Sequence, residues 1–354
     1  MPKKAAGLLL VCASVVVWVS CATNSNHYLY AAQPTANNIV AYREDPNSGV
    51  LTLLSVSPIA AGPAVQALAL HPSKKYLYAA NTQENDISLF TIDTSGVLTE
   101  VTPRPKTDTA PTLLAMNSAG SFLYVGNSGA NDISVFSIDA GSGQLTAVGT
   151  PLQLGLIPNN MQVSPSGNFL YVIGAGLPGS IEVFSLSAGV PNQVPVQITQ
   201  VGTNPYGLAI DPSGAHLYVA NSLPDNSISE FTINSDGSLT ALSTIGGGTL
   251  SSPIALLIDN SGKYLYVANA GASSLSAYAI AAHGSLTLLT ANESVPTNSH
   301  PSFMVSDPSG KYVFVGNSSS PAIQSFSLDP GTGTLTSVTS YSVADTPTSI
   351  VVVP

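Results

Sequence analysis

The sequence predicts an all-β fold, a seven-bladed β-propeller with four antiparallel strands per blade, from three observations. A short phrase of the type Tyr-Leu-Tyr-Val-Ala-Asn recurs seven times, at steps of 46 to 48 residues. Each repeat consists of strand-like segments separated by turn residues, and the two ends of the chain carry complementary parts of one repeat. A period of about 40–50 residues built from strands is typical of propellers, which use one blade per repeat. The phrase begins at Tyr28, Tyr76, Phe122, Phe169, His216, Tyr264 and Tyr312.

The fifth repeat shows the order of elements expected within a blade. Short segments that are apolar, or that alternate apolar and polar residues, predict half-buried strands. The segment 211–214 reads Asp-Pro-Ser-Gly, in which Asp and Ser bond the local backbone and Gly takes positive φ, so it predicts a turn. A second turn is expected at 234–237, which reads Asn-Ser-Asp-Gly. The expected strands are 208–210, 217–220, 228–233 and 239–242.

The two ends of the chain are expected to close the ring. The first repeat begins at its second strand, at Tyr28, and lacks the strand that comes first in every other repeat. The chain ends with Ile350 to Val353, which match that missing strand and have no blade after them. We therefore expect 350–353 to form the innermost strand of the blade that Tyr28 begins. This pairing removes two open sheet edges, which would otherwise invite aggregation.

The N-terminal segment is typical of an export signal. Lysines near Met1 precede an apolar stretch, 5–19, that is short for a membrane span. The stretch ends in Trp-Val-Ser-Cys, which resembles a bacterial lipobox and implies a lipid on Cys21. The resemblance implies an outer-membrane or periplasmic lipoprotein; cleavage after Ala22 with plain secretion, or an uncleaved anchor, are the alternatives. The expected segments are 1–20 (signal peptide), 21–27 (lipid-anchored tether) and 28–354 (propeller).

Composition argues against several function classes. The net charge is −10 and only 8% of the residues are charged, so the chain lacks the basic surface that nucleic acid requires. Contact with a membrane is expected through the lipid alone. The two cysteines, Cys12 and Cys21, lie in or at the signal, so no disulfide or thiolate chemistry is expected in the propeller. After the signal the chain has no Trp, which counts against a redox propeller with stacked aromatics, and no cofactor is expected.

The repeated strands carry a family resemblance. The Tyr-Val-Ala-Asn and Tyr-Val-Gly-Asn strands, preceded by Asp-Pro-Ser-Gly turns, resemble those of the seven-bladed lactonase-like propellers. That group includes 6-phosphogluconolactonase, carboxymuconate cyclase and the YVTN-repeat surface proteins. The resemblance covers 28–354 and implies the fold, but a fold does not by itself imply a function.

The residues that the resemblance implies for catalysis are missing. In the enzymes of this group an inner strand starts Pro-Arg-His, and a glutamate follows the Asn of the next strand. Basic side chains suit a carboxylate or phosphate of the substrate, and His or Glu suits proton transfer during ring opening. No matching triplet here carries Arg or His, and no Glu follows a strand Asn, so a phosphate-bearing substrate is not expected. The matching triplets start at Pro111, Pro158, Pro205, Pro253, Pro301 and Pro347.

The candidate ligand site is the top mouth of the central channel, where the connections that lead into the inner strands converge. The side chains expected there offer amides and hydroxyls, which suit a neutral polyol or sugar. The alternative is that they bond inner-strand backbone groups and channel water. The expected ligand-binding residues are Gln66, Thr112, Asn159, Asn160, Tyr206 and Ser302.

One imidazole joins this set. His300 lies at the same mouth and is the candidate catalytic residue, as a general base. Because no acid partner is evident, the alternative is an ordinary loop residue. His71 and His283 fall in turns, His216 starts a strand and His27 falls in the tether. Histidines scattered in this way predict no metal site.

Two functions from different classes follow. In the first, the protein is an exported binding or scaffold propeller whose top face contacts a neutral glycan, a peptide or an envelope protein. In the second, it is a lactonase-type hydrolase that opens a sugar or related lactone, with His300 at the channel mouth. The missing Arg, His and Glu favour the first. A channel mouth without cationic side chains would favour binding, whereas a cationic one would favour an enzyme for acidic lactones.

Overall fold

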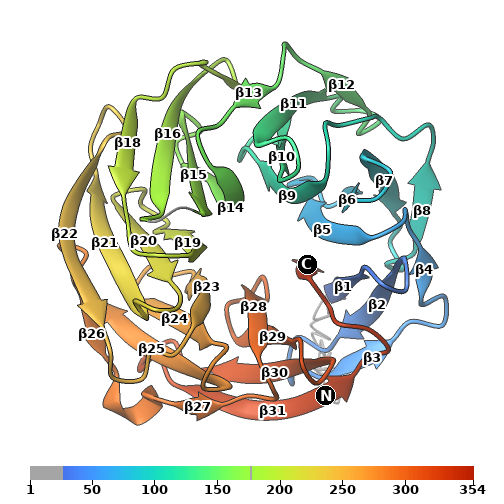
Figure 1. The fold of residues 1–354 in the computed structure, drawn as a ribbon. Helices are drawn as coiled ribbons and strands as arrows, with labels where there is room; N and C mark the ends of the chain where they lie inside the picture. Colours follow the sequence, from blue (N-terminus) through green and yellow to red (C-terminus); the bar gives the residue numbers. More distant parts are fainter. Residues whose placement is uncertain (1–26, 176–177) are drawn as a thin grey trace, which may run out of the picture.

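Seven sheets stand in a ring around a central axis in the computed structural model, which describes residues 27–175 and 178–354 (Figure 1). Each sheet holds four or five antiparallel strands, so the predicted seven-bladed propeller is confirmed. The one helical element in this part of the chain is a 3-10 turn, η1 (Thr290–Asn292). None of the described residues forms a helix that is long and apolar enough to cross a membrane. The expected signal peptide and Cys21 lie outside the described residues.

We number the blades 1 to 7 in the chain order of their second strands. The inner strands, from blade 1 to blade 7, are β32 (Ser349–Val353), β5 (Val65–Leu70), β9 (Pro111–Met116), β14 (Ile157–Val163), β19 (Pro205–Ile210), β23 (Pro253–Ile258) and β28 (Pro301–Ser306). The second strands are β1 (His27–Gln33), β6 (Tyr76–Asn81), β10 (Phe122–Asn127), β15 (Phe169–Ala175), β20 (His216–Asn221), β24 (Tyr264–Asn269) and β29 (Tyr312–Asn317).

The third strands lie between the second strands and the outer strands. They are β2 (Asn38–Glu44), β7 (Asp86–Ile92), β11 (Asp132–Ile138), β16 (Ser180–Ser187), β21 (Ser227–Ile233), β25 (Ser274–Ile280) and β30 (Ala322–Leu328). The outer strand is continuous in blades 2, 5 and 7 as β8 (Leu98–Val101), β22 (Leu239–Gly246) and β31 (Leu335–Ser342). It is split in the other blades into β3 (Leu51–Leu53) and β4 (Ile59–Ala60), β12 (Leu145–Ala147) and β13 (Leu152–Gln153), β17 (Val190–Pro191) and β18 (Gln197–Gln200), and β26 (Leu286–Leu288) and β27 (Val295–Pro296).

The ring closes as the sequence predicts. The C-terminal strand β32 pairs with β1 in antiparallel register, with Tyr28 opposite Val353 and Ala32 opposite Ser349. Blade 1 is therefore built from both ends of the chain, and neither end leaves an open inner edge. Strand β1 begins at His27, so this histidine belongs to the sheet and not to the tether in which it was expected.

The hydrophobic core is divided into seven clusters, one between each pair of neighbouring blades. This division follows from alternation, because residues i and i+2 of a strand face one neighbouring blade and the residues between them face the other. In blade 5, for example, Leu217 and Val219 pack toward blade 4, whereas Tyr218 packs toward blade 6.

A repeated hydrogen bond links each blade to the next. The second strand carries a buried Tyr whose hydroxyl donates to the carbonyl of a Gly in the hairpin between the third and fourth strands of the following blade. We call this bond the tyrosine latch. The six latches are Tyr30–Gly96 (2.7 Å), Tyr78–Gly143 (2.7 Å), Tyr124–Gly189 (2.6 Å), Tyr171–Gly237 (3.0 Å), Tyr218–Gly284 (2.7 Å) and Tyr266–Gly333 (3.0 Å). In blade 7 the matching residue is Phe314, which has no hydroxyl to donate to Gly49 of blade 1.

Candidate functional site

The inner strands surround the channel, and the mouth that we call the top is the end at which they begin (Figure 1). Each inner strand of blades 2 to 7 contains a β-bulge near its start, directly after a Pro in blades 3 to 7 and after Val65 in blade 2. A bulge leaves one residue without a ladder partner and turns its side chain out of the regular alternation. The bulged residues are Gln66, Thr112, Asn159, Tyr206, Ile254 and Ser302.

Five of the predicted ligand residues thus occupy one equivalent position in five blades. The bulge takes each of these side chains out of the regular alternation toward the neighbouring blades. Tyr206 is 44% exposed there, whereas Gln66, Thr112, Asn159 and Ser302 are half-buried.

Below the mouth lies a cavity of about 470 Å³ between the inner strands of blades 1, 3, 4 and 7. Asn160 is the one predicted residue that lines it. The lining residues are Leu114, Ala115, Met116, Asn160, Met161, Gln162, Val163, Phe303, Met304, Thr348, Ser349 and Ile350. Within the described chain, this lining contains no charged side chain. A neutral polar molecule therefore matches it better than an anion does.

Many polar groups around the channel already bond a neighbouring inner strand. The amides of Asn159 and Asn160 donate to the carbonyls of Pro205 and Tyr206, at 2.9 and 3.0 Å. The Gln162 side-chain oxygen accepts from the Ile210 backbone N–H at 3.1 Å. These bonds support the alternative stated above, in which the polar side chains satisfy backbone groups between blades.

Blade 1 contributes in the same way. The Thr348 hydroxyl donates to the Gln66 carbonyl at 2.8 Å, and the Ser349 hydroxyl accepts from the Leu68 N–H at 3.1 Å. Thr348, Ser349 and Gln162 line the cavity but were not among the predicted residues. Residues i and i+2 of a strand lie on the same face, so the predicted position of Asn160 could also have identified Gln162.

His300 is exposed at the mouth, in the connection that precedes β28. Its φ is +55°, a left-handed conformation in which His is more common than most residues. Its carbonyl accepts from the Ser318 N–H at 2.9 Å, while its Nδ1 lies 3.0 Å from the Ser299 hydroxyl. Ala64, Ala110 and Ser252 share the positive φ and the equivalent carbonyl bond in their blades. The backbone of His300 is therefore a repeated structural feature, and only its imidazole is particular to blade 7.

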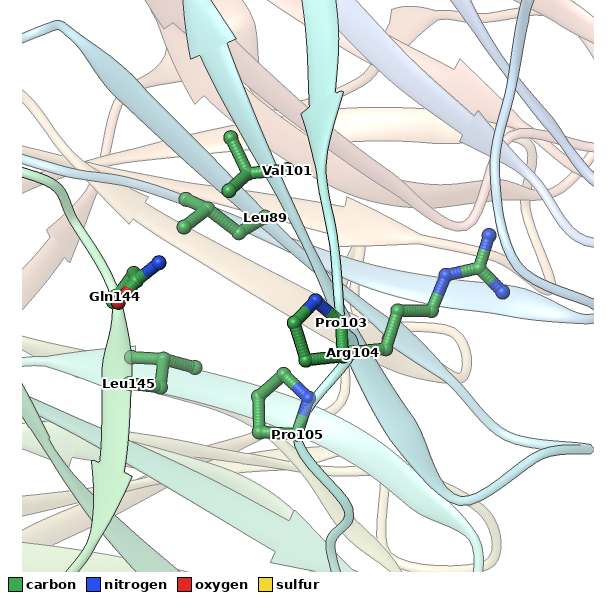
Figure 2. A pocket seen from close by; sticks show the side chains of 7 residues that line it. All are labelled: Leu89, Val101, Pro103, Arg104, Pro105, Gln144 and Leu145. Atoms are coloured by element: carbon green, nitrogen blue, oxygen red, sulfur yellow. The ribbon is translucent and has the colours of Figure 1, made fainter.

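The arginines of the propeller lie away from the channel. Arg43 is exposed on β2. Arg104 lines a cleft of about 170 Å³ on the outer rim between blades 2 and 3. Gln144 lies on the opposite side of this cleft, and Figure 2 shows the Arg104 guanidinium pointing away from it. It pairs with Glu100 at 2.7 Å, which raises its pKa. Neither arginine is placed to bind a substrate anion in the channel.

A second outer cavity, of about 300 Å³, adjoins this cleft and contains Lys106 and Asp108 in its lining. Lys106 pairs with the buried Asp86 at 2.9 Å. The equivalent Asp132 of blade 3 is buried, which raises its pKa, and accepts a 2.7 Å bond from the Asn127 amide. Asn81 makes the same bond to Asp86 at 2.8 Å. The bond from Asn to Asp is present within both blade 2 and blade 3. It is therefore a structural bond that closes the loop between the second and third strands of a blade.

Comparison with known proteins agrees with this architecture. A family model described as "Lactonase, 7-bladed beta-propeller" matches residues 58–157, 102–188, 157–249 and 247–352. A search of curated proteins found no match. Two crystal structures of putative 6-phosphogluconolactonases are similar to the chain at 22% identity and a TM-score of 0.80. The Bacteroides fragilis structure covers 94% of this chain and 99% of its own, and the Bacteroides uniformis structure covers 93% and 100%.

A periplasmic gluconolactonase of Pseudomonas aeruginosa is also similar, at 20% identity and a TM-score of 0.76, with 93% of this chain and 99% of that chain covered. Likeness at this level of identity establishes the shared fold. The family model establishes the family as well, because its matches cover most of the ring, from blade 2 to the closing strand of blade 1. The chain therefore belongs to the lactonase family of seven-bladed β-propellers.

Proposed function

We propose that the protein hydrolyses an uncharged, sugar-type lactone at the top mouth of its channel. The observation that carries this proposal is the match of the chain to the lactonase family, and the uncharged lining of the cavity is what points to a lactone without charge. A volume of about 470 Å³ falls within the range of small-molecule sites. The similarity to a gluconolactonase described as periplasmic agrees with a substrate that carries no phosphate.

Hydrolysis of a lactone needs a water molecule, a base and donors for the developing oxyanion. Water attacks the carbonyl carbon, the ring C–O bond breaks, and the proton removed from water is returned to the alkoxide, which leaves an open-chain hydroxy acid. In this proposal the imidazole of His300, which is exposed in the connection before β28 and does not line the cavity, takes the proton of the attacking water at the mouth. The Gln162 amide, whose oxygen is held by the Ile210 N–H, offers an N–H donor toward the cavity.

The test is acid release by the purified full-length chain, followed in a pH-stat with the spontaneous opening of each lactone subtracted. The substrates are gluconolactone, 6-phosphogluconolactone and muconolactone. We expect turnover of gluconolactone and at least 100-fold less after His300→Ala, which is within the usual contribution of a general base. His283→Ala is the matched control, because His283 is also exposed but lies in the hairpin between β25 and β26. Faster turnover of the phosphorylated lactone would contradict the uncharged site.

A second candidate is binding without turnover, as an exported binding or scaffold protein for a neutral glycan, a peptide or an envelope partner. It is favoured by the bonding of the Asn159 and Asn160 amides to backbone carbonyls and by the absence of a charged acid or base among the described cavity-lining residues. Absence of turnover on all three lactones, together with saturable binding of a neutral sugar in calorimetry, would support this candidate instead.

Export and lipid attachment at Cys21 complete the proposal. Only the lipobox-like sequence supports them. Metabolic labelling of cells with a fatty-acid analogue should label the wild-type protein and not the Cys21→Ser variant. Equal labelling of both proteins would contradict this assignment.

A further inference from the structure

Blade 1 carries a carboxylate at a position that is aliphatic in every other blade. Glu44 ends β2 and lies opposite His27, the first residue of β1. The equivalent side chains of blades 2 to 7 belong to the hydrophobic clusters between blades. They are Ile92, Ile138, Leu186, Ile233, Ile280 and Leu328. A carboxylate in such a place requires a compensating partner, because burial of an unpaired charge is strongly unfavourable.

The partners around Glu44 are another acid and a histidine. The Glu44 side chain is 0% exposed and the His27 side chain 7% exposed. Asp307, in the turn between β28 and β29 of blade 7, is likewise fully buried. Neither carboxyl oxygen of Glu44 has a hydrogen-bond partner among the described residues, nor does His27 Nδ1. Buried polar atoms without partners are rare in native proteins, and here several point into one space.

The geometry of the three groups fits a metal ion. One ligand atom from each of His27, Glu44 and Asp307 lies within 4.8 Å of the other two. His27 Nδ1 and Glu44 Oε2 are 3.3 Å apart yet form no hydrogen bond. Two ligands of a tetrahedral zinc ion, each about 2.0–2.1 Å from the metal, are separated by about 3.4 Å. The spacing thus agrees with two atoms that share one ion.

The charges of the three side chains also favour binding of a cation. Two carboxylates and a neutral imidazole carry two negative charges, which one divalent ion neutralises. Asp307 is already held by the turn, since one oxygen accepts from the Lys311 and Tyr312 N–H groups at 2.7 Å. Its other oxygen accepts from Ser309, whose hydroxyl can rotate to free a lone pair for a metal. Imidazole with carboxylates suits zinc, whereas calcium and magnesium prefer sites made of oxygen alone.

We propose that His27, Glu44 and Asp307 bind a zinc ion that fastens blade 1 to blade 7. This interface is the one between described blades that lacks a tyrosine latch, because blade 7 has Phe314 at the latch position. It is also the place where the first strand of the ring meets the last complete blade. Zinc bound there ties β1 and β2 to blade 7 and opposes opening of the ring.

The experiment measures zinc binding and thermal unfolding of the purified full-length chain after EDTA treatment and removal of the chelator. Three proteins are compared: wild type, Glu44→Leu and, as a matched control, His216→Gln. Leu is chosen because aliphatic residues occupy this position in six blades, so the variant is expected to fold. His216 pairs with Asp211 at 2.9 Å in blade 5 but has no second carboxylate in such a cluster. A competing chromophoric chelator reports the zinc affinity.

We expect wild type and His216→Gln to bind one zinc ion each and to unfold at a higher temperature in its presence. Glu44→Leu should bind zinc at least 100-fold more weakly and show no such shift. Equal zinc affinity in wild type and Glu44→Leu, or no zinc binding by wild type, would overturn the proposal.

Discussion

Replacing Tyr218 by phenylalanine removes one tyrosine latch and nothing else. The Tyr218 ring is fully buried, and its hydroxyl donates to the Gly284 carbonyl of the next blade at 2.7 Å. A hydrogen bond contributes about 0.5–1.5 kcal/mol net, and leaving its buried partner unsatisfied costs about 1–3 kcal/mol. We therefore expect Tyr218→Phe to lower the free energy of unfolding by about 2 kcal/mol.

The reverse change tests the same reasoning in the opposite direction. Gly49 of blade 1 packs against the ring of Tyr312, and a methyl group built on it would lie 2.3 Å from Cδ1 of that ring. Gly96, which does accept a latch, packs in the same way against the ring of Tyr28, also at 2.3 Å. A hydroxyl added at Phe314 is therefore placed to reach the Gly49 carbonyl. We expect Phe314→Tyr to raise the free energy of unfolding by about 1 kcal/mol.

Urea denaturation followed by circular dichroism measures both changes, with thermal unfolding alongside. For the about 330 residues of the propeller the entropy of unfolding is about 0.7 kcal/mol per kelvin, so 2 kcal/mol corresponds to about 3 °C. The assay is done in EDTA, so that metal at the interface of blades 7 and 1 does not contribute. If Tyr218→Phe changes stability by less than about 0.5 kcal/mol, the lower end of the net contribution of a hydrogen bond, the latch does not have the role assigned to it. Destabilisation by Phe314→Tyr would contradict that role too.

Three further predictions concern the hairpins, a buried acid and ring closure. Gly237→Ala should destabilise the protein by about 2–5 kcal/mol in urea denaturation, because φ is +83° and the added methyl would lie 2.3 Å from Phe169. Burial raises the pKa of Glu230, so its contribution to stability is full below about pH 4.5 and is lost as the pH rises through the folded-state pKa. Glu230→Gln should therefore gain stability relative to wild type as urea titrations move from pH 4 to pH 8. Deletion of 349–354 removes β32 and exposes the inner edge of β1, so size-exclusion chromatography should show aggregates.

Each of these has a control or a contrary outcome. Gly167 also has positive φ, +73°, but nothing lies within 4 Å of an added methyl, so Gly167→Ala should cost only about 1 kcal/mol. Equal costs at Gly167 and Gly237 would show that contact with the aromatic ring is unimportant. A pH-independent difference between Glu230→Gln and wild type would mean that the carboxyl is not destabilised by burial. A monomeric, folded deletion variant would contradict the closure of blade 1 by β32.

The number of blades and the closure of the ring could be predicted from the sequence because both follow from local patterns. Alternation marks each strand, turn residues mark each hairpin, and the repeat fixes how many blades there are. The pairing of 350–353 with the strand at Tyr28 follows from matching one incomplete repeat with another. The expected strands of blade 5 agree with β19 to β22, which extend by a few residues at some ends, where strand boundaries depend on pairing.

The candidate channel site could be predicted only in part. Counting from the start of each inner strand identified five residues that prove to be bulged, although the bulge itself is a matter of pairing between strands. The same counting missed Gln162, Thr348 and Ser349 in the cavity wall. Which side chains share one space in the channel depends on the tilt and spacing of inner strands from several blades, and no local pattern records these.

By itself, the sequence determined a ring of seven blades, the strand that closes it and the absence of cationic residues at the starts of the inner strands. These features depend on interactions within a repeat or between neighbouring repeats. The repeat pattern of the sequence is therefore enough to predict them. Only the tertiary structure decided that His27, Glu44 and Asp307 meet. Asp307 comes from the last complete blade and the other two from the first strands, and ring closure alone brings such distant residues together.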